Sequence, residues 1–441
     1  MQKRTKKLVG VLLALLMISG CFTGVISDYA EESVPIDAAH FPDEGWRQIV
    51  AEYYDKDDNN ELSPEERSVT TMSITGMKET LLGEDVPVKS IEGIEYFTDL
   101  ETLRCGGIGL TTLDVSKLTN LVHLTCQGNE LKELIVRYNV MLQELNCADN
   151  NLSELSLTYN INLQRLLCEN NDITSLDTST LSHLVYLKCS NNNISSLNLA
   201  SNSQLQTLIC SNNHISALDL SANTQLAETT ASAIGNQTIT AQATQSNNTF
   251  YVAVPLAADR IVYTNMETYS DGQFVTTDYS RMLDGFVYDY STGNSNSEPI
   301  DVTVTCEKDF YQVRFYTDES KTTLIAANAV NSGETVQAPD YNPGACIYVE
   351  GWSDSLENIT ADKDVYAICK EEHHYAVTAF SDDNVATISC TGGCGYSRTV
   401  RFLDCLNAKT GSENYEPLLD VNSDGYINGR DYVLLLREFN K

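Results

Sequence analysis

Six cysteines that recur every 21 residues are the feature that most restricts how this 441-residue chain can fold. Asparagines keep the same interval, and the shared unit is LxxLxCxxNxLxxLxLxxNxx, as in LVHLTCQGNELKELIVRYNVM. A constant period of this length predicts a solenoid in which equivalent residues of successive coils stack on one another. The cysteines are Cys105, Cys126, Cys147, Cys168, Cys189 and Cys210, and the asparagines are Asn129, Asn150, Asn171, Asn192 and Asn213.

Each position of the unit has a physical role. In LxxLxC, the leucine and the cysteine are expected to face inward from a short parallel strand, and the asparagine amide turns inward to satisfy backbone groups where the strand bends. Stacked strands lie about 4.8 Å apart, but side chains that stand parallel have poor geometry for a disulfide. We therefore expect a buried column of reduced thiols that act as small apolar side chains.

The unit resembles the leucine-rich repeat, which implies a repeat domain over residues 91–229. The first copy has Ile108 in the asparagine position, as expected of a terminal repeat. The residues that flank the central leucine of each strand are expected to face outward on the concave side. Arginine and tyrosine are common interface anchors, so this mixed apolar and basic patch is our candidate for binding a protein or glycan. Its residues are His123, Arg165, Tyr186, Lys188 and Ile209.

Upstream of the repeats, FPDEGWRQIVAEYYDKDDNNELSPEE predicts helix, loop and helix, with oxygen-bearing side chains at the spacing of an EF-hand loop. Position 6 is Asn60 instead of glycine, and asparagine tolerates the left-handed turn required there. Residues 31–90 resemble the EF-hand-like cap of secreted bacterial leucine-rich-repeat proteins, which implies a structural Ca²⁺. Loop positions 1, 3, 5, 7, 9 and 12 are Asp55, Asp57, Asn59, Glu61, Ser63 and Glu66.

Two β-type segments follow the repeats. Residues 230–308 alternate apolar and polar residues between turn clusters and resemble the immunoglobulin-like segment that caps such solenoids. Residues 309–371 resemble the internalin-type β-repeat, which implies a small β-grasp-like module with Trp352 in its core. The matching residues are Val313, Phe315, Gly333, Pro339, Gly351, Trp352, Ile359 and Asp362.

Further along, the segment HHYAVTAFSDDNVATISCTGGCGYS leaves three interpretations open: a zinc site, a disulfide, or free thiols in a loop. The zinc interpretation would use His373, His374, Cys390 and Cys394, although two adjacent histidines fit one tetrahedron poorly. Four other cysteines have no partner that the sequence identifies: Cys306, Cys346, Cys369 and Cys405.

The tail DVNSDGYINGRD has Gly425 at position 6 of a second calcium-type loop and runs directly into the expected helix GRDYVLLLREF. This combination resembles a dockerin over residues 372–441, which implies Ca²⁺, a cohesin partner on a cellulosome scaffold, and cohesin contacts by Gly429, Arg430 and Arg437. The paired first unit would fall at Thr387 to Arg398, where no ligand position is a carboxylate. Loop positions 1, 3, 5, 7, 9 and 12 are Asp420, Asn422, Asp424, Tyr426, Asn428 and Asp431.

The N-terminus predicts export. Four basic residues precede the short apolar run LVGVLLALLMI, so residues 1–30 are expected to be a signal peptide. Ile18 to Cys21 resembles a lipobox, and ordinary cleavage, for instance after Ser27, is the alternative. A lipid on Cys21 would be the sole membrane anchor. The net charge of −33, from 61 acidic and 28 basic residues, argues against a nucleic-acid partner.

We find no HExxH, GxSxG or phosphate-binding glycine loop, so we expect no enzyme. The expected fold class is a multidomain α+β chain: a solenoid with an EF-hand-like cap, β-sandwich and β-grasp-like modules, and a helical dockerin-like module, with more sheet than helix. The predicted function is extracellular binding of a protein or glycan, with docking to a cohesin. Two alternatives remain, a lipid-anchored adhesin with a structural calcium tail and a dockerin-borne polysaccharide-degrading enzyme.

Overall fold

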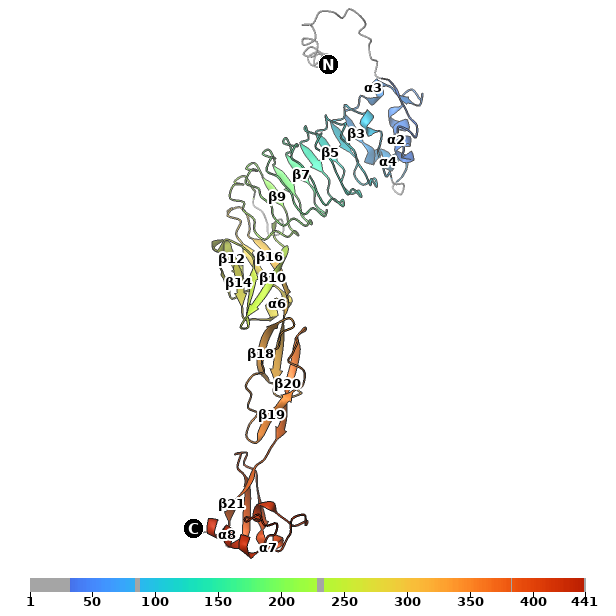
Figure 1. Cartoon of the computed structure of the whole chain (residues 1–441). Helices are drawn as coiled ribbons and strands as arrows, with labels where there is room; N and C mark the ends of the chain where they lie inside the picture. The colour runs from blue at the N-terminus through green and yellow to red at the C-terminus, as the bar shows by residue number, and fades with distance from the viewer. Residues whose placement is uncertain (1–31, 84–87, 228–233, 382, 440–441) are drawn as a thin grey trace, which may run out of the picture. The chain divides into compact units, whose positions relative to one another are not determined.

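The computed structural model describes residues 32–83, 88–227, 234–381 and 383–439, and it contains more strand than helix, as predicted (Figure 1). The expected signal peptide and Cys21 lie outside the described residues. Within the described part, no helix combines the length and the apolar character needed to cross a membrane. The chain forms two compact units, one of Met1–Gln237 with Ser291–Ile300 and the other of Thr238–Tyr290 with Asp301–Lys441.

Short parallel strands form the solenoid of the first unit. Successive strands pair at an interval of 21 residues, so that Leu124 lies opposite Leu145 and Leu145 opposite Leu166. These central leucines are fully buried, and the flanking residues are partly or fully exposed. The predicted leucine-rich-repeat architecture is confirmed. The strands are β4 (Thr102–Arg104), β5 (His123–Thr125), β6 (Glu144–Asn146), β7 (Arg165–Leu167), β8 (Tyr186–Lys188) and β9 (Thr207–Ile209).

The repeat cysteines and asparagines fill the interior as predicted. All six repeat cysteines are free and fully buried. Asn129 Nδ2 donates to the carbonyls of Cys105 and Cys126, both at 2.9 Å, and its Oδ1 accepts from the backbone N–H of Leu110 at 3.0 Å. Because each amide binds its own coil and the preceding one, the asparagines tie neighbouring coils together.

A second ladder, formed by another series of asparagines, also links neighbouring coils. Asn160 Nδ2 donates to the carbonyls of Val136 and Asn139, both at 3.0 Å, and Asn223 makes the equivalent bonds to Leu199 and Asn202. Asn294 extends this ladder beyond the last repeat by donating to the carbonyls of Leu220 and Asn223. A non-repeat segment therefore supplies the next rung.

The first ladder has a similar substitute. Gln237 Nε2 donates to the carbonyls of Cys210 and Ile234, and its Oε1 accepts from the N–H of Ile215. The extra methylene of glutamine lets a residue outside the 21-residue register reach the same backbone groups. Gln237 and Asn294 together satisfy polar groups that a solenoid end would otherwise expose.

The cap begins with β1 (Val34–Pro35) and the helix α2 (Glu44–Tyr54), whose N-cap residue Asp43 accepts from the N–H of Trp46 through its side chain. The fully buried Trp46 belongs to the core, as its position in a cap predicts. The remaining elements are β2 (Glu61–Leu62), α3 (Pro64–Arg67), β3 (Thr71–Ser73), α4 (Ile74–Leu81) and η1 (Ile94–Tyr96). Because β3 pairs in parallel with β4, the cap adds one strand to the solenoid sheet.

The second unit begins with a seven-stranded sheet in the order β12-β15-β16-β10-β11-β14-β13. It consists of β10 (Gln237–Ser246), β11 (Thr249–Ala253), β12 (Ile261–Thr264), β13 (Thr268–Ser270), β14 (Gln273–Thr276), β15 (Phe286–Tyr290) and β16 (Ile300–Lys308), with the short helices η2 (Ala258–Arg260) and α6 (Ser280–Asp284).

A four-stranded sheet follows, formed by β17 (Phe310–Tyr316), β18 (Leu324–Asn331), β19 (Ile347–Trp352) and β20 (Lys363–Glu371). Its order is β18-β17-β20-β19, with β17 parallel to β20. Trp352 packs edge-on against the buried Phe315, with ring centroids 4.8 Å apart. Trp352 therefore belongs to the core of this module, as predicted.

The first half of the C-terminal module consists of strands, where the dockerin resemblance implied a loop and a helix. The module opens with three antiparallel strands, β21 (Tyr375–Phe380), β22 (Val385–Cys390) and β23 (Ser397–Arg401), and then has α7 (Phe402–Cys405), η3 (Pro417–Leu419) and α8 (Gly429–Phe439). The stretch expected as the first loop of the dockerin pair, Thr387 to Arg398, belongs to the β22–β23 hairpin. Its alternating apolar residues and glycine-rich turn favour a hairpin over a loop and helix.

Candidate functional site

The predicted ligand-binding residues lie side by side on the solenoid strands. Arg165 pairs in register with Glu144 on one side and Tyr186 on the other. The Arg165 guanidinium carbon lies 4.4 Å from the centre of the Tyr186 ring, and its Nε lies 3.6 Å from Glu144 Oε1. A stacked, charge-paired row therefore crosses three neighbouring strands.

The patch is less basic than the sequence suggested, because carboxylates face its cations. Lys188 Nζ lies 2.8 Å from Glu169 Oε1, and hydrogen bonding to this carboxylate raises the pKa of Lys188. His123 Nδ1 lies 3.5 Å from Glu144 Oε2. Ile209, on β9, is half-buried. The 21-residue repeat places Glu144 beside both Arg165 and His123, so these charge pairs could have been predicted from the sequence.

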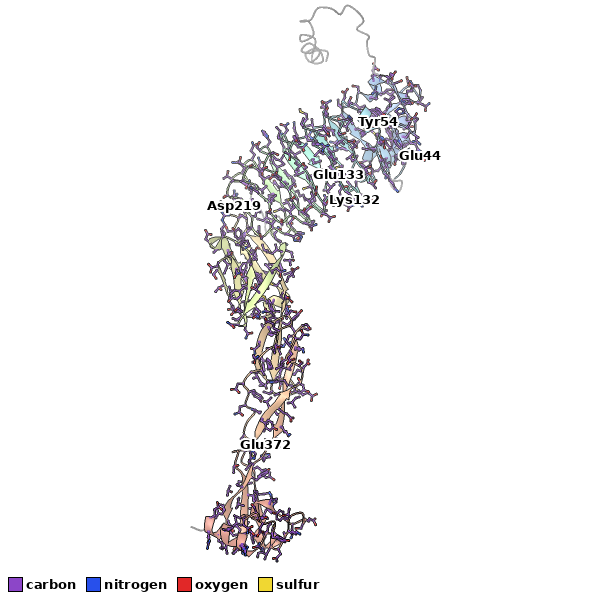
Figure 2. The ribbon with its side chains drawn as sticks, viewed as in Figure 1. Glu44, Tyr54, Lys132, Glu133, Asp219 and Glu372 are labelled. Carbon is purple, nitrogen blue, oxygen red and sulfur yellow. The ribbon has the colours of Figure 1, made fainter. Side chains whose placement is uncertain are left out.

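A depression of about 820 Å³ lies away from the strand face and was not predicted. Its lining includes Lys132 and Glu133, which Figure 2 labels on the solenoid. Here Arg137 lies over the ring of Tyr138, with its guanidinium carbon 4.9 Å from the ring centre. The exposed Ile135 and Tyr138 in variable positions of one repeat were the available sequence signal.

The first calcium-type loop brings its acidic residues together. Carboxylate oxygens of Asp55, Asp57 and Glu66 lie within 4.8 Å of one another. Asp55 accepts from the N–H groups of Asn59 and Asn60 at 3.1 and 2.9 Å, and Asn60 has the expected left-handed backbone, with φ of 62°. The Ser63 hydroxyl donates to Glu66 at 2.8 Å, and Glu61 at position 7 begins β2.

The tail loop repeats this geometry. Oxygens of Asp420, Asp424 and Asp431 lie within 4.8 Å of one another, and Asp420 accepts from the N–H groups of Asp424 and Gly425 at 3.1 and 2.8 Å. Asp431 accepts from the N–H groups of Asn422 and Asn428, and the Tyr426 carbonyl accepts from Asn428 Nδ2 at 3.4 Å.

Carboxylate and carbonyl oxygens at this spacing suit Ca²⁺, and in both loops the last acidic side chain binds the N–H of position 9. The shared arrangement of two loops so far apart in the sequence therefore supports the donor sets chosen from the sequence. Calcium binding itself stays a prediction.

The expected docking residues belong to α8, which has the predicted bounds. Gly429, Arg430 and Arg437 are all exposed, and the buried Leu435 packs into the core of the module. The dockerin resemblance also implied that the tail helix packs against a preceding helix through Leu403. This prediction is wrong, because Leu403 is 54% exposed and its neighbour Phe402 is buried in its place. The short α7 ends at Cys405, before it can provide a second helical face.

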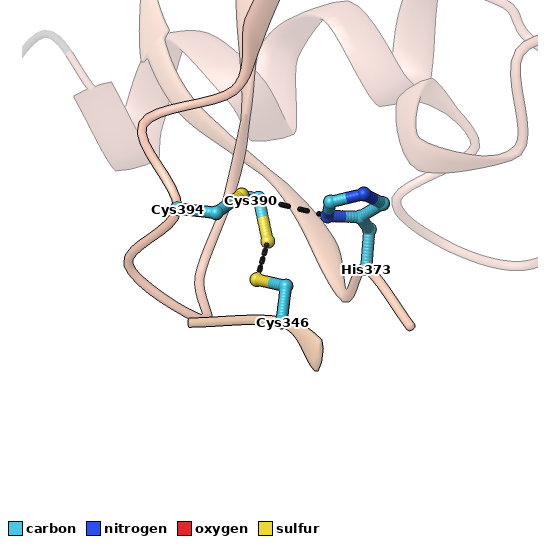
Figure 3. Close-up of side chains that lie close together, drawn as sticks. All are labelled: Cys346, His373, Cys390 and Cys394. Atoms are coloured by element: carbon cyan, nitrogen blue, oxygen red, sulfur yellow. Dashed lines mark hydrogen bonds between the residues drawn. The ribbon is translucent and has the colours of Figure 1, made fainter. Parts of the chain in front are cut away.

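A cluster of thiols and an imidazole forms the third group of possible ligands (Figure 3). One atom each of Cys346, His373, Cys390 and Cys394 lies within 4.8 Å of the others. His374 is not part of the cluster, since its side chain is 75% exposed. Cys346 was missed because it lies 44 residues before Cys390. A hydrogen bond from Cys346 lowers the pKa of the Cys390 thiol.

No protein-family model matches the chain, and no curated protein matches it. Among solved structures, an internalin from Listeria monocytogenes (InlF) is 24% identical over 48% of this chain and 68% of its own, with a TM-score of 0.40. A leucine-rich-repeat protein of Leptospira interrogans is 25% identical over 37% of this chain and 44% of its own, with a TM-score of 0.33.

The functional domain of InlJ from Listeria monocytogenes, described as including a cysteine ladder, is 18% identical over 63% of this chain and 99% of its own, with a TM-score of 0.22. These are resemblances, and the architecture of the present chain rests on its own 21-residue strand register and asparagine ladders. On that basis the chain contains a leucine-rich-repeat solenoid.

Proposed function

We propose that this protein is an exported, non-catalytic binding protein whose leucine-rich repeats recognise a protein or glycan through the strand face. The observation that carries the proposal is the row of Glu144, Arg165 and Tyr186 on three adjacent strands. Stacking on Tyr186 and pairing with Glu144 hold the guanidinium in place, so that little side-chain entropy remains to be lost on binding.

The row suits a partner that offers both a flat apolar surface and hydrogen-bond acceptors. Arginine donates in a planar fork, and tyrosine offers an aromatic face with a polar end. A sugar ring with its hydroxyls and a protein surface with an exposed carboxylate both meet this description. Because Glu144 and Glu169 compensate the two cations, we expect binding to depend on shape more than on net charge.

Glycan and secreted-protein arrays probed with the full exported chain test this proposal. Any ligand found should bind Arg165→Ala and Tyr186→Ala at least tenfold more weakly, as is usual for anchor residues. The control is a second arginine–tyrosine pair off the strand face, as Arg137→Ala and Tyr138→Ala. Loss of binding in the control pair alone would assign recognition to the depression and overturn the strand-face proposal.

We further propose that the tail loop and α8 form a calcium-dependent docking unit of the dockerin kind, with a cohesin as partner. The exposed Arg430 and Arg437 on one helix behind an acidic loop support this. A panel of cohesins in millimolar Ca²⁺ tests it, with Asp420→Ala/Asp424→Ala as the variant that should lose binding. If no cohesin binds the parent chain, the tail is a structural module and the protein is better described as a surface adhesin.

A further inference from the structure

Four chain segments bring their ligand-type side chains to one point in the second unit. Cys346 precedes β19, His373 lies between β20 and β21, Cys390 ends β22, and Cys394 lies in the turn before β23. Cys346 Sγ lies 3.0 Å from Cys390 Sγ, and Cys394 Sγ lies 3.4 Å from His373 Nδ1 (Figure 3). The cluster joins a loop of the four-stranded sheet to the β22–β23 hairpin.

The backbone around the cluster is shaped to let the sulfur atoms approach. Cys346 has φ of 63°, a left-handed conformation that is unfavourable for a residue with a Cβ. A Cβ on Gly392 would lie 2.5 Å from Cys346 Sγ, so any side chain there would displace this sulfur atom. The N–H of Gly392 donates to Cys390 Sγ at 3.4 Å. Backbone strain of this kind persists where the surroundings impose it, and it is concentrated at functional sites.

Other groups orient the imidazole. His373 Nε2 lies 3.6 Å from Glu371 Oε2, which leaves Nδ1 directed at the sulfur atoms. The ring centroids of Tyr375 and Tyr396 lie 5.5 and 5.9 Å from that of His373 and 5.6 Å from each other, so the three rings form one cluster. A carboxylate beside the second ring nitrogen is the usual arrangement around a histidine that binds a metal.

We propose that Cys346, His373, Cys390 and Cys394 bind one structural zinc ion. Three thiolates and one imidazole are a common structural zinc donor set, and four protein ligands leave no open position for catalysis. Bound zinc would fasten the loop before β19 to the hairpin. It would thereby stabilise a small module whose sheet has just three strands.

A disulfide between Cys346 and Cys390 is the competing explanation in an exported protein. It would use two of the four groups and leave the third thiol and the oriented imidazole without a role. The Sγ–Sγ distance of 3.0 Å lies between the two cases, since a disulfide needs about 2.05 Å and two sulfurs on one zinc lie about 3.8 Å apart. Geometry around His373 and Cys394 therefore favours the metal.

Metal analysis of the full chain, exported into an oxidising compartment and purified without chelators, tests the proposal. We expect one zinc ion per chain and no Cys346–Cys390 cross-linked peptide under non-reducing mass spectrometry. Added Co²⁺ should give the visible absorption bands of a tetrahedral thiolate site. Glu371→Gln should weaken zinc binding by about tenfold or more, because it acts through the orientation of His373.

Neighbouring residues outside the cluster provide matched controls. Cys394→Ser and His373→Asn should lose the zinc, whereas Cys369→Ser and His374→Asn should keep it, since both control side chains are exposed and outside the cluster. A zinc-selective chelator should lower the melting temperature of the parent chain, and a calcium-selective chelator should leave the zinc content unchanged. A zinc-free chain with a Cys346–Cys390 disulfide would overturn the proposal, as would full zinc content in Cys394→Ser.

Discussion

Asn294 donates from Nδ2 to the carbonyl of Asn223 at 2.9 Å, and Asn223 donates in the same way to the carbonyl of Asn202, also at 2.9 Å. The first bond joins a non-repeat segment to the last coil, and the second joins two repeats. A residue far along the sequence therefore acts as an additional rung of the solenoid.

Replacing Asn294 with alanine should destabilise the solenoid. The change leaves the carbonyls of Leu220 and Asn223 without this donor, at a cost of about 1–2 kcal/mol for partly buried groups. Urea unfolding followed by circular dichroism should show the loss, and the exposed Asn193→Ala should show little change. Equal stability of Asn294→Ala and the parent would mean that this rung does not support the solenoid end.

The buried thiols predict an alkaline loss of stability. Burial raises the pKa of Cys105 from 9.0 to about 12. Between these values the unfolded chain has lost thiol protons that the folded chain still holds. The contribution of such a thiol to the free energy of unfolding is therefore fully present below pH 9. Above pH 9 the free energy of unfolding falls by about 1.4 kcal/mol per pH unit for each such thiol.

Urea titrations at several pH values above 9 can measure this slope. Cys105→Ala should reduce the slope of the unfolding free energy against pH by about 1.4 kcal/mol per pH unit, the contribution of one thiol proton. Cys369→Ala should leave the slope unchanged, because Cys369 is exposed in the folded chain. Identical slopes for both variants would show that the column of thiols does not control alkaline unfolding.

An irregular rung of the second ladder suggests a stabilising substitution. In one coil the Thr178 hydroxyl lies 2.9 Å from Asn202 Oδ1, whereas the Oδ1 atoms of Asn139, Asn160 and Asn223 are buried without a partner. Val136 occupies the position relative to Asn160 that Thr178 occupies relative to Asn202. Val136→Thr should therefore supply the missing donor.

The expected gain is up to about 1 kcal/mol, and thermal unfolding can detect it. The same change at the buried Val50 of α2 should destabilise by about 1–3 kcal/mol, because it places a hydroxyl in an apolar core. A loss of stability in Val136→Thr as large as that in Val50→Thr would contradict the proposed bond.

The sequence predicted the solenoid well because the residues that determine this fold are local and repeated. Leucines and cysteines equivalent to Leu145 and Cys147 occur in every coil, and the strand register follows from the 21-residue period. It did not predict Gln237 and Asn294 as rungs, since both lie outside the 21-residue interval. Their role becomes visible when chain segments that are distant in sequence are seen together.

The C-terminal module shows a different kind of error. Family spacing placed the first loop of a dockerin pair, without carboxylate ligands, at Thr387 to Arg398, whereas the alternating residues around Ile388 form a strand. The local pattern was therefore a better guide than the distance counted from the second loop. Cys346 was missed because chain topology, and no motif, brings it to Cys390. Both calcium-type loops were found, since an EF-hand donor set lies within twelve consecutive residues.

The last prediction concerns the dependence of α8 on calcium. Its 11 residues are too few for a stable isolated helix, and its first turn contains the fully buried Asp431, which lies close to Asp420 and Asp424. Without a cation, the carboxylates repel one another at short range. Calcium should therefore bind and order the helix in one step.

Calorimetric titration of the full chain should find two calcium sites, one in each loop. Asp424→Ala should remove the tail site and reduce the protection of α8 amides from hydrogen exchange, while Asp57→Ala should remove the cap site and leave α8 protected. Glu438→Gln, on the exposed side of the same helix, should bind calcium like the parent. If the α8 amides exchange at the same rate with and without calcium, packing of Leu435 against the core is sufficient to order the helix. Calcium binding in the loop would then not control the folding of α8.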